Sequence, residues 1–257
     1  MDEFDVSRPN VARMYDYALG GKDNFPLDRA AACEIRRVLQ DAFLSAQANR
    51  RFLKRAVSHI ARAGVTQFVD IGVGLPTDEN THEIVQAVNG RCRVVYVDHD
   101  PVVINHARAI LAQAPNVLAV PGDLREARAI LEDSALREFL DPGLPVAVVL
   151  AAVLHYVDGP EAYKAVEYVK QALPRGSFLV ISHATADEAG QDETREVRSV
   201  YGCASAPLTL RTAAEVGRFF DGLDLTEPGI TAVAAWRNQA AGKRERCLCY
   251  GGVARKN

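Results

Sequence analysis

The stretch Gln67–Val85, Q-F-V-D-I-G-V-G-L-P-T-D-E-N-T-H-E-I-V, sets a short apolar run, a glycine-rich turn and a helix start in direct succession. The run is aliphatic with a single charge, which is typical of a strand covered on both faces. Gly72 and Gly74 form the turn, and Asn80 with Glu83 makes a capping pair for a following helix. Strand, turn and helix in this order predict a β-α unit.

Similar units recur along the middle of the chain. The predicted strands are Gln67–Ile71, Arg93–Val97, Val117–Pro121, Val146–Leu150, Ser177–His183, Gly229–Ala235 and Leu248–Ala254. The predicted helices between them are Thr81–Ala87, Val102–Gln113, Ala127–Phe139, Pro160–Leu173 and Ala213–Asp221. Repeated β-α units require a parallel sheet with right-handed crossovers. The last two strands lack a helix between them, so we expect one of them to be antiparallel at the edge.

The first 65 residues have a different character. Three helices are predicted there, and Gly20 with Gly21 ends the first of them before a turn-rich connector, K-D-N-F-P-L-D. The helices are expected at Pro9–Leu19, Arg29–Phe43 and Ala46–Ala63. We therefore predict a helical cap or lid over residues 1–65 and an α/β domain over residues 66–257.

Composition narrows the classes of function. The net charge of -3 provides no global basic field for nucleic acid, and the acidic, polar N-terminus is unlike a secretory signal. The longest nearly unbroken apolar run, Leu144–Val153, is too short to span a bilayer. Five cysteines without a C-x-x-C pair favour a reducing cytoplasm and suggest no metal site. The basic run over residues 49–62 has one apolar stripe, as surface helices do, so we expect no nucleic-acid partner. A homodimer is left open.

Acidic residues follow three successive predicted strands. Asp98 ends the second strand, where a carboxylate can accept both hydroxyls of a ribose. Asp123 follows the third, placed to accept from an adenine amino group, with Leu124 as an apolar neighbour for the ring. Asp70 precedes Gly72, and a carboxylate there suits a positively charged amino acid end and repels a pyrophosphate. Each of these residues has an alternative role in capping a turn, and a G-x-G turn can be a plain connection. Their joint placement favours a ligand.

The helix after the turn begins too late for a dinucleotide. The nicotinamide fingerprint needs a third small residue at position 77, opening a helix at once, whereas Thr77 follows Pro76 and the expected cap is Asn80. The helix dipole is then poorly placed for a diphosphate. The turn therefore suits S-adenosylmethionine better than a nicotinamide dinucleotide.

The chain resembles the class I S-adenosylmethionine-dependent methyltransferases, and more narrowly an actinobacterial family first catalogued as a domain of unknown function. The general motifs are F-V-D-I-G-V-G-L-P-T (68–77), V-V-Y-V-D-H-D-P-V-V (94–103), G-D-L-R (122–125), A-V-L-H-Y-V (152–157), L-V-I-S-H-A-T (179–185) and G-R-F-F-D-G-L (217–223). The segments S-R-P-N-V-A-R-M-Y-D-Y-A-L-G-G-K-D-N-F (7–25) and N-R-R-F-L-K-R-A-V (49–57) also match, and G-G-K-D-N-F is specific to the narrower family. The resemblance implies a Rossmann-like, seven-stranded, mostly parallel sheet with helices on both faces.

The resemblance also implies site residues. Asp70, Gly72 and Gly74 would contact the methionine end of the cofactor. His99 would lie beside the adenine, and Ala151, after the fourth strand, beside the sulfonium. The strand-four end reads A-A-V-L-H, without the N-P-P-Y or D-P-P-Y signature, which puts methylation of a nucleic-acid base or glutamine amide in doubt.

Methyl transfer from a sulfonium is an in-line displacement, so the main tasks of the protein are alignment and exclusion of water. If a general base is used, the candidates near the strand ends are His155 and His183, although a lone histidine is more often structural. Aromatic residues for an acceptor pocket or lid are Tyr15, Tyr17, Phe25 and Tyr201. The polar turn Lys22, Asp23 and Asn24 is expected to fold over the amino acid end of the cofactor.

We expect a cytoplasmic methyltransferase that modifies O or N of a small molecule, plausibly a specialised metabolite. One alternative is a nicotinamide-dependent oxidoreductase, which would bind NAD(P) and not S-adenosylmethionine. The other is a non-catalytic module that binds S-adenosylmethionine or a partner, in which no acceptor-sized cavity would open at the sulfonium. A methyltransferase acting on RNA or protein would show salt-dependent affinity for its polymer.

Overall fold

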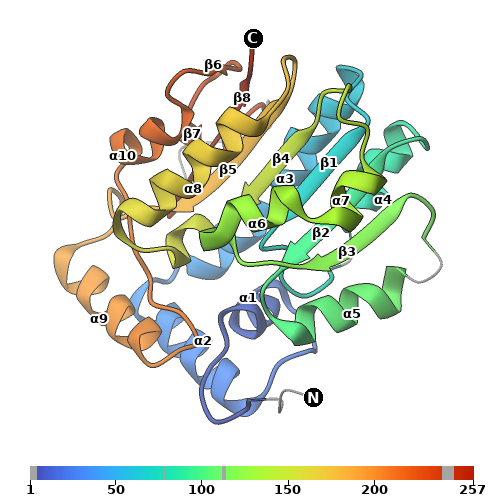
Figure 1. Cartoon of the computed structure of the whole chain (residues 1–257). Coiled ribbons are helices and arrows are strands. Elements are labelled where there is room, and N and C mark those ends of the chain that lie inside the picture. The colour runs from blue at the N-terminus through green and yellow to red at the C-terminus, as the bar shows by residue number, and fades with distance from the viewer. Residues whose placement is uncertain (1–4, 78, 112–113, 239–245) are drawn as a thin grey trace.

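The predicted β-α units form one sheet in the computed structural model, which describes residues 5–77, 79–111, 114–238 and 246–257 (Figure 1). Its strands are β1 (Gln67–Ile71), β2 (Arg93–Asp98), β3 (Val117–Pro121), β4 (Ala147–Ala151), β5 (Phe178–Ala184), β6 (Asp224–Leu225), β7 (Thr231–Ala232) and β8 (Cys249–Arg255). They are ordered β3-β2-β1-β4-β5-β8-β6, and β7 also pairs with β8. Strands β1 to β5 pair in parallel, and β8 runs antiparallel to β5, as expected at that edge.

Helices precede the sheet and cover both of its faces. The helices are α1 (Val11–Leu19), α2 (Pro26–Val38), α3 (Ala42–Arg62), α4 (Thr81–Val88), α5 (Pro101–Leu111), α6 (Ala127–Glu132), α7 (Ser134–Phe139), α8 (Gly159–Ala172), α9 (Gln191–Gly202) and α10 (Ala213–Gly217). Short 3-10 turns lie at Leu124–Glu126, Leu154–Tyr156 and Arg218–Phe220. The predicted Rossmann-like α/β fold is confirmed.

Alternation along the strands divides the core into two layers. Phe68 of β1 faces a cluster that contains Phe52 and Ile60 of α3, all with no exposed surface. Val69, the next residue along the strand, faces the opposite cluster with Val166 of α8. Successive side chains point to opposite faces of a strand, so an aliphatic run buried on both faces serves two cores. Figure 1 shows the sheet between these layers, with α6, α7 and α8 in front and α3 behind.

The strand order reverses between β1 and β4, which lie side by side in the middle of the sheet. Ligands of open α/β sheets bind beyond the carboxyl ends of the strands at such a reversal. The glycine turn after β1 and the loop after β4 lie together there. The sheet order therefore selects the edge at which a site can form.

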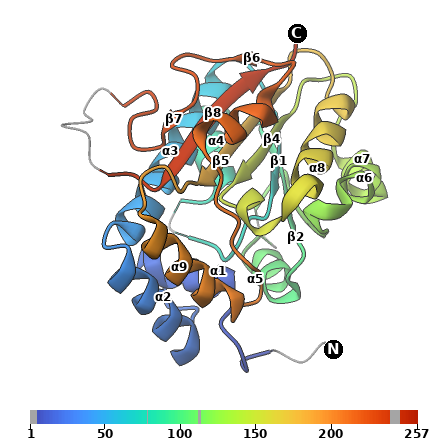
Figure 2. The ribbon, with the colours of Figure 1, turned by 90° about the vertical axis from the view of Figure 1, so that its left-hand side faces the viewer.

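The N-terminal helices play two different roles. Helix α3 packs directly on the sheet, whereas Met14 of α1 and Ile35 of α2 form a third cluster with Val197 of α9 (Figure 2). A buried ion pair between Arg13 and Asp28, 2.7 Å long, ties α1 to α2. Only α1 and α2 thus have the position of a cap, and a boundary at residue 65 stays a prediction.

The edge of the sheet differs from the predicted one. The described residues form eight strands instead of seven, because the predicted strand Gly229–Ala235 is reduced to β7 and a turn, and the two residues of β6 were not predicted. Both short strands pair only with β8. Ile230, Thr231 and Val233 favour a strand, but β8 pairs in register only with Thr231 and Ala232 of this segment, so the pairing available at the edge decides its structure.

Several helix bounds also shift. The predicted helix Ala127–Phe139 is broken at Asp133, whose side chain accepts the backbone N–H of Leu136 at 2.9 Å and caps a second helix. The predicted helix Ala213–Asp221 is α10 followed by a 3-10 turn. The predicted end of a helix at Gln113 lies outside the described residues. The capping pair of Asn80 and the capping box of Thr212 are confirmed.

Candidate active site

The turn after β1 needs glycine for two separate reasons. Gly72 has a φ of +74°, and a Cβ at this position would lie 2.2 Å from Cγ2 of Val153 in the loop after β4. Gly74 has a φ of +68°, but its Cβ would meet no heavy atom within 4 Å. The N–H of Gly72 donates to the carbonyl of Val97 at 2.8 Å, which holds the turn across the end of β2. The backbone therefore passes close to the edge where strand order reverses.

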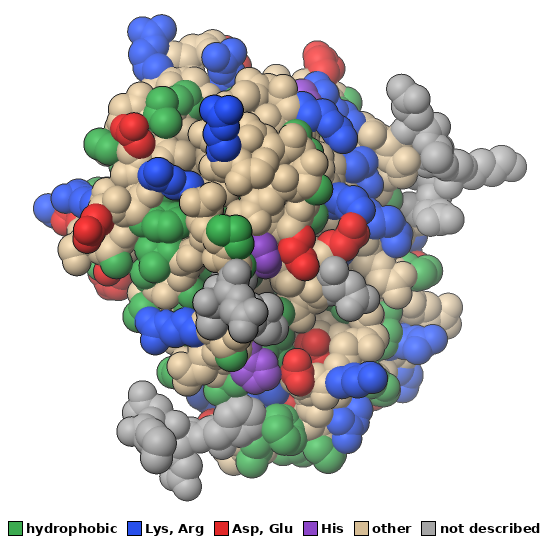
Figure 3. Space-filling model, turned by 90° about the vertical axis from the view of Figure 1, so that its right-hand side faces the viewer, with side chains coloured by type: hydrophobic (Ala, Val, Ile, Leu, Met, Phe, Trp, Pro, Cys, Tyr) green, Lys and Arg blue, Asp and Glu red, His purple; other side chains and the backbone are tan. Residues whose placement is uncertain are grey.

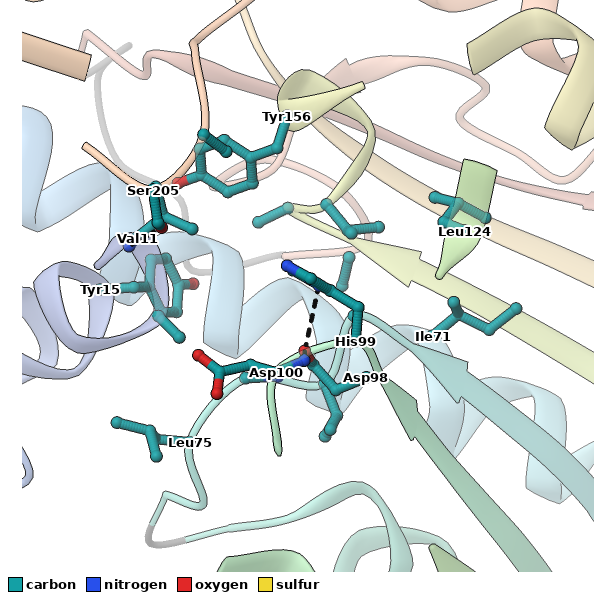
Figure 4. Close-up of a pocket in the computed structure, with 18 of the residues that line it drawn as sticks. Val11, Tyr15, Ile71, Leu75, Asp98, His99, Asp100, Leu124, Tyr156 and Ser205 are labelled. Atoms are coloured by element: carbon teal, nitrogen blue, oxygen red, sulfur yellow. Dashed lines mark hydrogen bonds and ion pairs between the residues drawn. The ribbon is translucent and has the colours of Figure 1, made fainter. Parts of the chain in front are cut away.

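Asp98, at the end of β2, anchors the same turn. One carboxylate oxygen accepts the N–H of Gly74 at 3.0 Å, and the other accepts the N–H of Asp100, also at 3.0 Å. His99 lies on the outer side, with its Nδ1 3.5 Å from the Asp98 carboxylate (Figure 4). This hydrogen bond raises the pKa of His99 from its ordinary value. A buried carboxylate thus ends a strand directly beside the glycine turn.

Asp123 lies in the loop after β3 and is already engaged. Its carboxylate accepts the backbone N–H of Arg125 at 2.9 Å and pairs with the guanidinium of the same residue. The side-chain hydrogen bond to Arg125 is the main reason that the pKa of Asp123 is lowered. Leu124 is buried beside it, at 4% exposure. A ligand that reaches Asp123 must share it with Arg125 or displace that side chain.

These groups line one cavity of about 190 Å³, which we call the polar cavity. Its walls include Gly72, Gly74, Asp98, His99, Asp123, Leu124 and Ala151. Helix α1 closes the opposite side, where Val11 and Tyr15 face the strand ends (Figure 4). The N–H of Val11 donates to Ser205 Oγ at 3.1 Å, so the loop after α9 holds the start of α1. Residues distant in sequence complete a single concave site.

A basic side chain from α3 enters the polar cavity near the glycine turn. The Arg50 guanidinium donates to Thr77 Oγ1 and, at 2.7 Å, to the carbonyl of Glu79. These two bonds fix the guanidinium just beyond Gly74. The amino acid end of a ligand in the turn would meet a positive group suited to a carboxylate.

A second cavity of about 130 Å³, which we call the apolar cavity, lies between the strand ends and α1, α2 and α3. Four residues line both cavities: Tyr15, Asn49, Ala152 and Tyr156. Burial raises the pKa of Tyr15 to about 12 and that of Tyr156 well above its ordinary value, so both phenols are neutral at physiological pH. The two cavities therefore meet at a junction walled by neutral side chains.

The family model for S-adenosyl methyltransferases matches residues 1–257. The chain belongs to this family. It is an S-adenosylmethionine-dependent methyltransferase, and the nicotinamide alternative is thereby set aside.

Solved structures agree with the family assignment. A DUF574 family protein from Streptomyces avermitilis is 41% identical, with a TM-score of 0.93 over 98% of this chain and 99% of the other. A candidate methyltransferase from Thermobifida fusca is 36% identical, with a TM-score of 0.92 over 98% and 97% of the two chains. The methyltransferase CalH, bound to S-adenosylhomocysteine, shares the fold at 15% identity, with a TM-score of 0.57 over 95% and 72%. A search of curated proteins finds no match.

The polar cavity fits the cofactor of this methyltransferase family. The turn after β1 can approach Val153 in the loop after β4 only because position 72 has no Cβ, and both residues line the polar cavity. Asp98 presents a carboxylate toward the cavity from the end of β2, and Arg50 presents a positive group near the turn. Ala152, after β4, has a φ of +58°, an unusual conformation for alanine, at the point where the loop enters both cavities.

Asp70 does not line either cavity. Its carboxylate is 4% exposed and accepts the hydroxyl of Thr81 at 2.6 Å, which ties β1 to the start of α4. Burial raises the pKa of Asp70 to about 6. The predicted direct contact with the methionine end has no support in this geometry, because the carboxylate points behind the turn rather than into the cavity.

The two histidines expected as bases are both engaged. The Nδ1–H of His183 donates to the carbonyl of Ala184 at 2.7 Å, and its Nε2 accepts from Arg211 at 2.8 Å, so the ring is fully bonded and lines neither cavity. His155 lines the apolar cavity, but its Nδ1 accepts the N–H of Ala184 at 3.3 Å. The proton of neutral His155 is then on Nε2. Neither ring offers a free basic nitrogen, which argues against both as general bases.

The residues expected to form a lid over the cofactor instead build the cap. The side chain of Asn24 donates to the buried carboxylate of Asp16 at 2.8 Å, and the N–H of Asp23 donates to the same oxygen. A Cβ on Gly21 would lie 1.9 Å from Asp16 Oδ1, so this turn closes only on glycine. The G-G-K-D-N-F segment therefore holds Asp16, which itself lines the polar cavity.

The remaining residues predicted for the lid and the acceptor pocket lie either away from both cavities or in a cavity wall. Lys22 and Phe25 are exposed, and Tyr17 packs edge-on against Phe43 at 5.9 Å outside both cavities. Tyr201 lines the apolar cavity, where its ring lies 5.9 Å from that of Tyr156. Together with Tyr15, which lines both cavities, two of the four aromatic candidates therefore lie at a cavity wall.

Several residues that line the cavities were not predicted from the sequence, among them Asn49, Arg50 and Tyr156. Asn49 and Arg50 lie in the run that was interpreted as a plain surface helix, and Tyr156 lies within the A-V-L-H-Y-V motif. The buried stripe of that helix, including Phe52, was predicted correctly. A polar pair at the end of the stripe nearest the strand ends is a signal that could have marked Asn49 and Arg50.

Proposed function

We propose that this methyltransferase transfers the methyl group of S-adenosylmethionine to an oxygen or nitrogen of a small molecule, plausibly a specialised metabolite. The observation that carries the proposal is the junction of two cavities at Ala152 and Tyr156, where an acceptor can lie directly beside the cofactor. A non-catalytic binding module has no need of an acceptor-sized cavity at this point.

Different residues around the polar cavity would bind different parts of the cofactor. Asp98 would accept the ribose hydroxyls, with His99 beside the adenine. Asp123 and Leu124 would hold the adenine edge. Gly72 and Gly74 would offer backbone N–H groups to the amino acid end, where we add Arg50 as the partner of the carboxylate. Ala151 would leave room for the sulfonium.

The cofactor supplies an electrophilic methyl carbon on a positively charged sulfur. The chain would contribute alignment and exclusion of water: Tyr15 and Val11 of α1 line the polar cavity opposite the strand ends, and the acceptor would reach the methyl group from the adjoining apolar cavity. Because both histidines are bonded to the scaffold, we propose that neither removes a proton from the acceptor.

Other expected properties stand as proposals. We propose a cytoplasmic protein, and no helix of the described residues is long and apolar enough to cross a bilayer. Basic and acidic side chains are mixed on the face shown in Figure 3, and the net charge is -3, which favours a small-molecule acceptor over nucleic acid. A homodimer stays a prediction that sedimentation would test.

Calorimetry with two ligands tests the cofactor assignment. S-adenosylhomocysteine carries the amino acid end, and 5′-methylthioadenosine lacks it. Replacing Arg50 by Ala should weaken S-adenosylhomocysteine by roughly 10- to 150-fold, the value of a charged hydrogen bond, and leave 5′-methylthioadenosine unchanged. Tight NAD(P) binding without binding of S-adenosylhomocysteine would refute the function. Labelled methyl transfer into cell extracts would then locate the acceptor.

A further inference from the structure

The apolar cavity is contiguous with the polar cavity, yet its chemistry is different. Its walls come from α1, α2, α3, α9, the 3-10 turn Leu154–Tyr156, the end of β5 and the start of β8, and they include Met14, Ile35, Phe43, Val197 and Leu248. The two cavities share Ala152, which follows the strand where the sulfonium is proposed to lie. A molecule bound here would therefore abut the methyl group.

The wall of the apolar cavity carries no formal charge. Of the described residues that line it, none is Asp, Glu, Lys or Arg. The ring of His155 is neutral because burial lowers its pKa well below the ordinary value. An ion brought into such a site loses several kcal/mol of solvation without gaining a partner. The cavity thus selects against charged acceptors.

The volume and the aromatic walls of the apolar cavity suggest a bound molecule with one ring. In another protein a dry apolar cavity of about 150 Å³ holds benzene, and this cavity measures about 130 Å³. The rings of Tyr156 and Tyr201, tilted by 42° to each other, and that of Phe43 belong to residues in the wall. Aromatic walls favour a planar guest through stacked and edge-on contacts.

A polar atom at the junction has no partner within the described part of the chain. Asn49 is 4% exposed, and its Nδ2 donates to the hydroxyl of Tyr15 at 2.9 Å, but its Oδ1 accepts no hydrogen bond. Leaving a buried acceptor unsatisfied costs about 1–3 kcal/mol. Because Asn49 lines both cavities, a donor on the bound acceptor can satisfy this oxygen.

Resting on the function proposed above, we propose that the apolar cavity binds the methyl acceptor, an uncharged, planar molecule of one-ring width whose hydroxyl or amine donates to Asn49 Oδ1. The hydrogen bond turns the lone pair of the donor atom toward the methyl carbon. This lone pair forms the new bond, the carbon–sulfur bond breaks with its electron pair kept by sulfur, and the displaced proton of the acceptor passes to solvent.

Calorimetry on the full chain saturated with S-adenosylhomocysteine tests the acceptor class. The uncharged probe is 4-methylphenol, and its charged counterparts are 4-hydroxybenzoate and tyramine. We expect 4-methylphenol to bind about tenfold or more tightly than either, since one lost ion solvation exceeds 1.4 kcal/mol. Equal or tighter binding of a charged probe, or binding of none, would overturn the proposal. Failure of S-adenosylhomocysteine itself to bind would overturn the proposed function as well.

The role of Asn49 is tested with a probe that lacks the donor. Wild type should bind 4-methylphenol about 5- to 150-fold more tightly than 4-methylanisole, corresponding to the cost of an unsatisfied buried oxygen. In Asn49→Leu this preference should vanish when both probes are titrated into protein saturated with S-adenosylhomocysteine. A preference that persists in Asn49→Leu, or is absent from wild type, would refute the assignment of Oδ1.

The location of the acceptor is tested by filling the cavity. Ala18→Leu from α1 and Ala42→Leu from α3 each add bulk to its wall, so that one variant serves if the other fails to fold. Ala30→Leu, on the exposed side of α2, is the matched control. Each filling variant should lose 4-methylphenol binding about tenfold, with S-adenosylhomocysteine affinity unchanged, while the control resembles wild type. Unchanged probe binding in a folded filling variant would place the acceptor elsewhere.

Discussion

Substitution of the first glycine in the turn separates backbone strain from steric contact. In Gly72→Ala the residue must keep a φ of +74°, which costs about 1–2 kcal/mol for a residue with a Cβ. The new methyl would also lie 2.2 Å from Val153 Cγ2, and overpacking of this kind costs about 1–3 kcal/mol. We therefore expect the free energy of unfolding to fall by about 2–5 kcal/mol.

Gly74→Ala is the matched control, because its φ of +68° carries the same strain and its Cβ meets nothing within 4 Å. The backbone strain alone should lower its free energy of unfolding by about 1–2 kcal/mol. Alanine also reduces the conformational entropy of the unfolded chain, and this offsets part of that loss. The difference between the two variants isolates the contact with Val153. Urea unfolding followed by circular dichroism measures both values.

A double-mutant cycle completes the test. Val153→Ala removes Cγ2, which the new Cβ would meet at 2.2 Å, but leaves Val153 Cβ at 2.6 Å. The double variant should therefore regain only part of the steric cost, as a favourable coupling of at most about 1–3 kcal/mol. The strain would remain, because it belongs to the backbone of residue 72. Equal destabilisation of Gly72→Ala and Gly74→Ala, or a cycle without coupling, would refute the close approach of the two loops at the cofactor edge.

Three further outcomes are expected. Asp98→Asn should weaken S-adenosylhomocysteine by roughly 10- to 150-fold in calorimetry, as for loss of a charged hydrogen bond, and an unchanged affinity would remove Asp98 from the ribose. Burial lowers the pKa of His183 from 6.5 to about 4, so the unfolded state binds more protons than the folded state between these pH values. The free energy of unfolding should therefore fall by about 3 kcal/mol as the pH is lowered from 6.5 to 4. His183→Gln should lack this part of the pH dependence in urea titrations, and an identical profile would contradict the buried neutral ring. Gly21→Ala should lose about 1–3 kcal/mol by collision with Asp16, whereas exposed Lys22→Ala should resemble wild type, and equal values would refute the packed turn.

Much of the cofactor edge was predictable because it depends on local order along the chain. A strand followed at once by Gly72 and Gly74, and a second strand ending in Asp98, must bring these residues to one edge of a parallel sheet. The same reasoning located Asp123, Leu124 and Ala151. It failed for the direction of the Asp70 side chain, which depends on Thr81 eleven residues later and on the position of α4.

The apolar cavity was beyond prediction because its walls come from helices, strand ends and loops that lie far apart along the chain. The basic run containing Asn49 and Arg50 has the pattern of an ordinary surface helix, and only the docking of α3 on the sheet brings these two residues to the junction. The surroundings of His183 also depend on a residue far along the chain. Its position at a strand end suggested a general base, but buried Arg211 from a distant loop donates a hydrogen bond to its Nε2.

By itself, the sequence determined the order of strands and turns, the edge at which we propose that the cofactor binds and the class of that cofactor, because these follow from periodicity and from residues adjacent along the chain. Only the tertiary structure decided which carboxylates face the cavity, which histidines are locked in the scaffold and where an acceptor fits. Those properties depend on contacts between segments far apart in sequence, whose mutual positions are set by packing rather than by any local pattern.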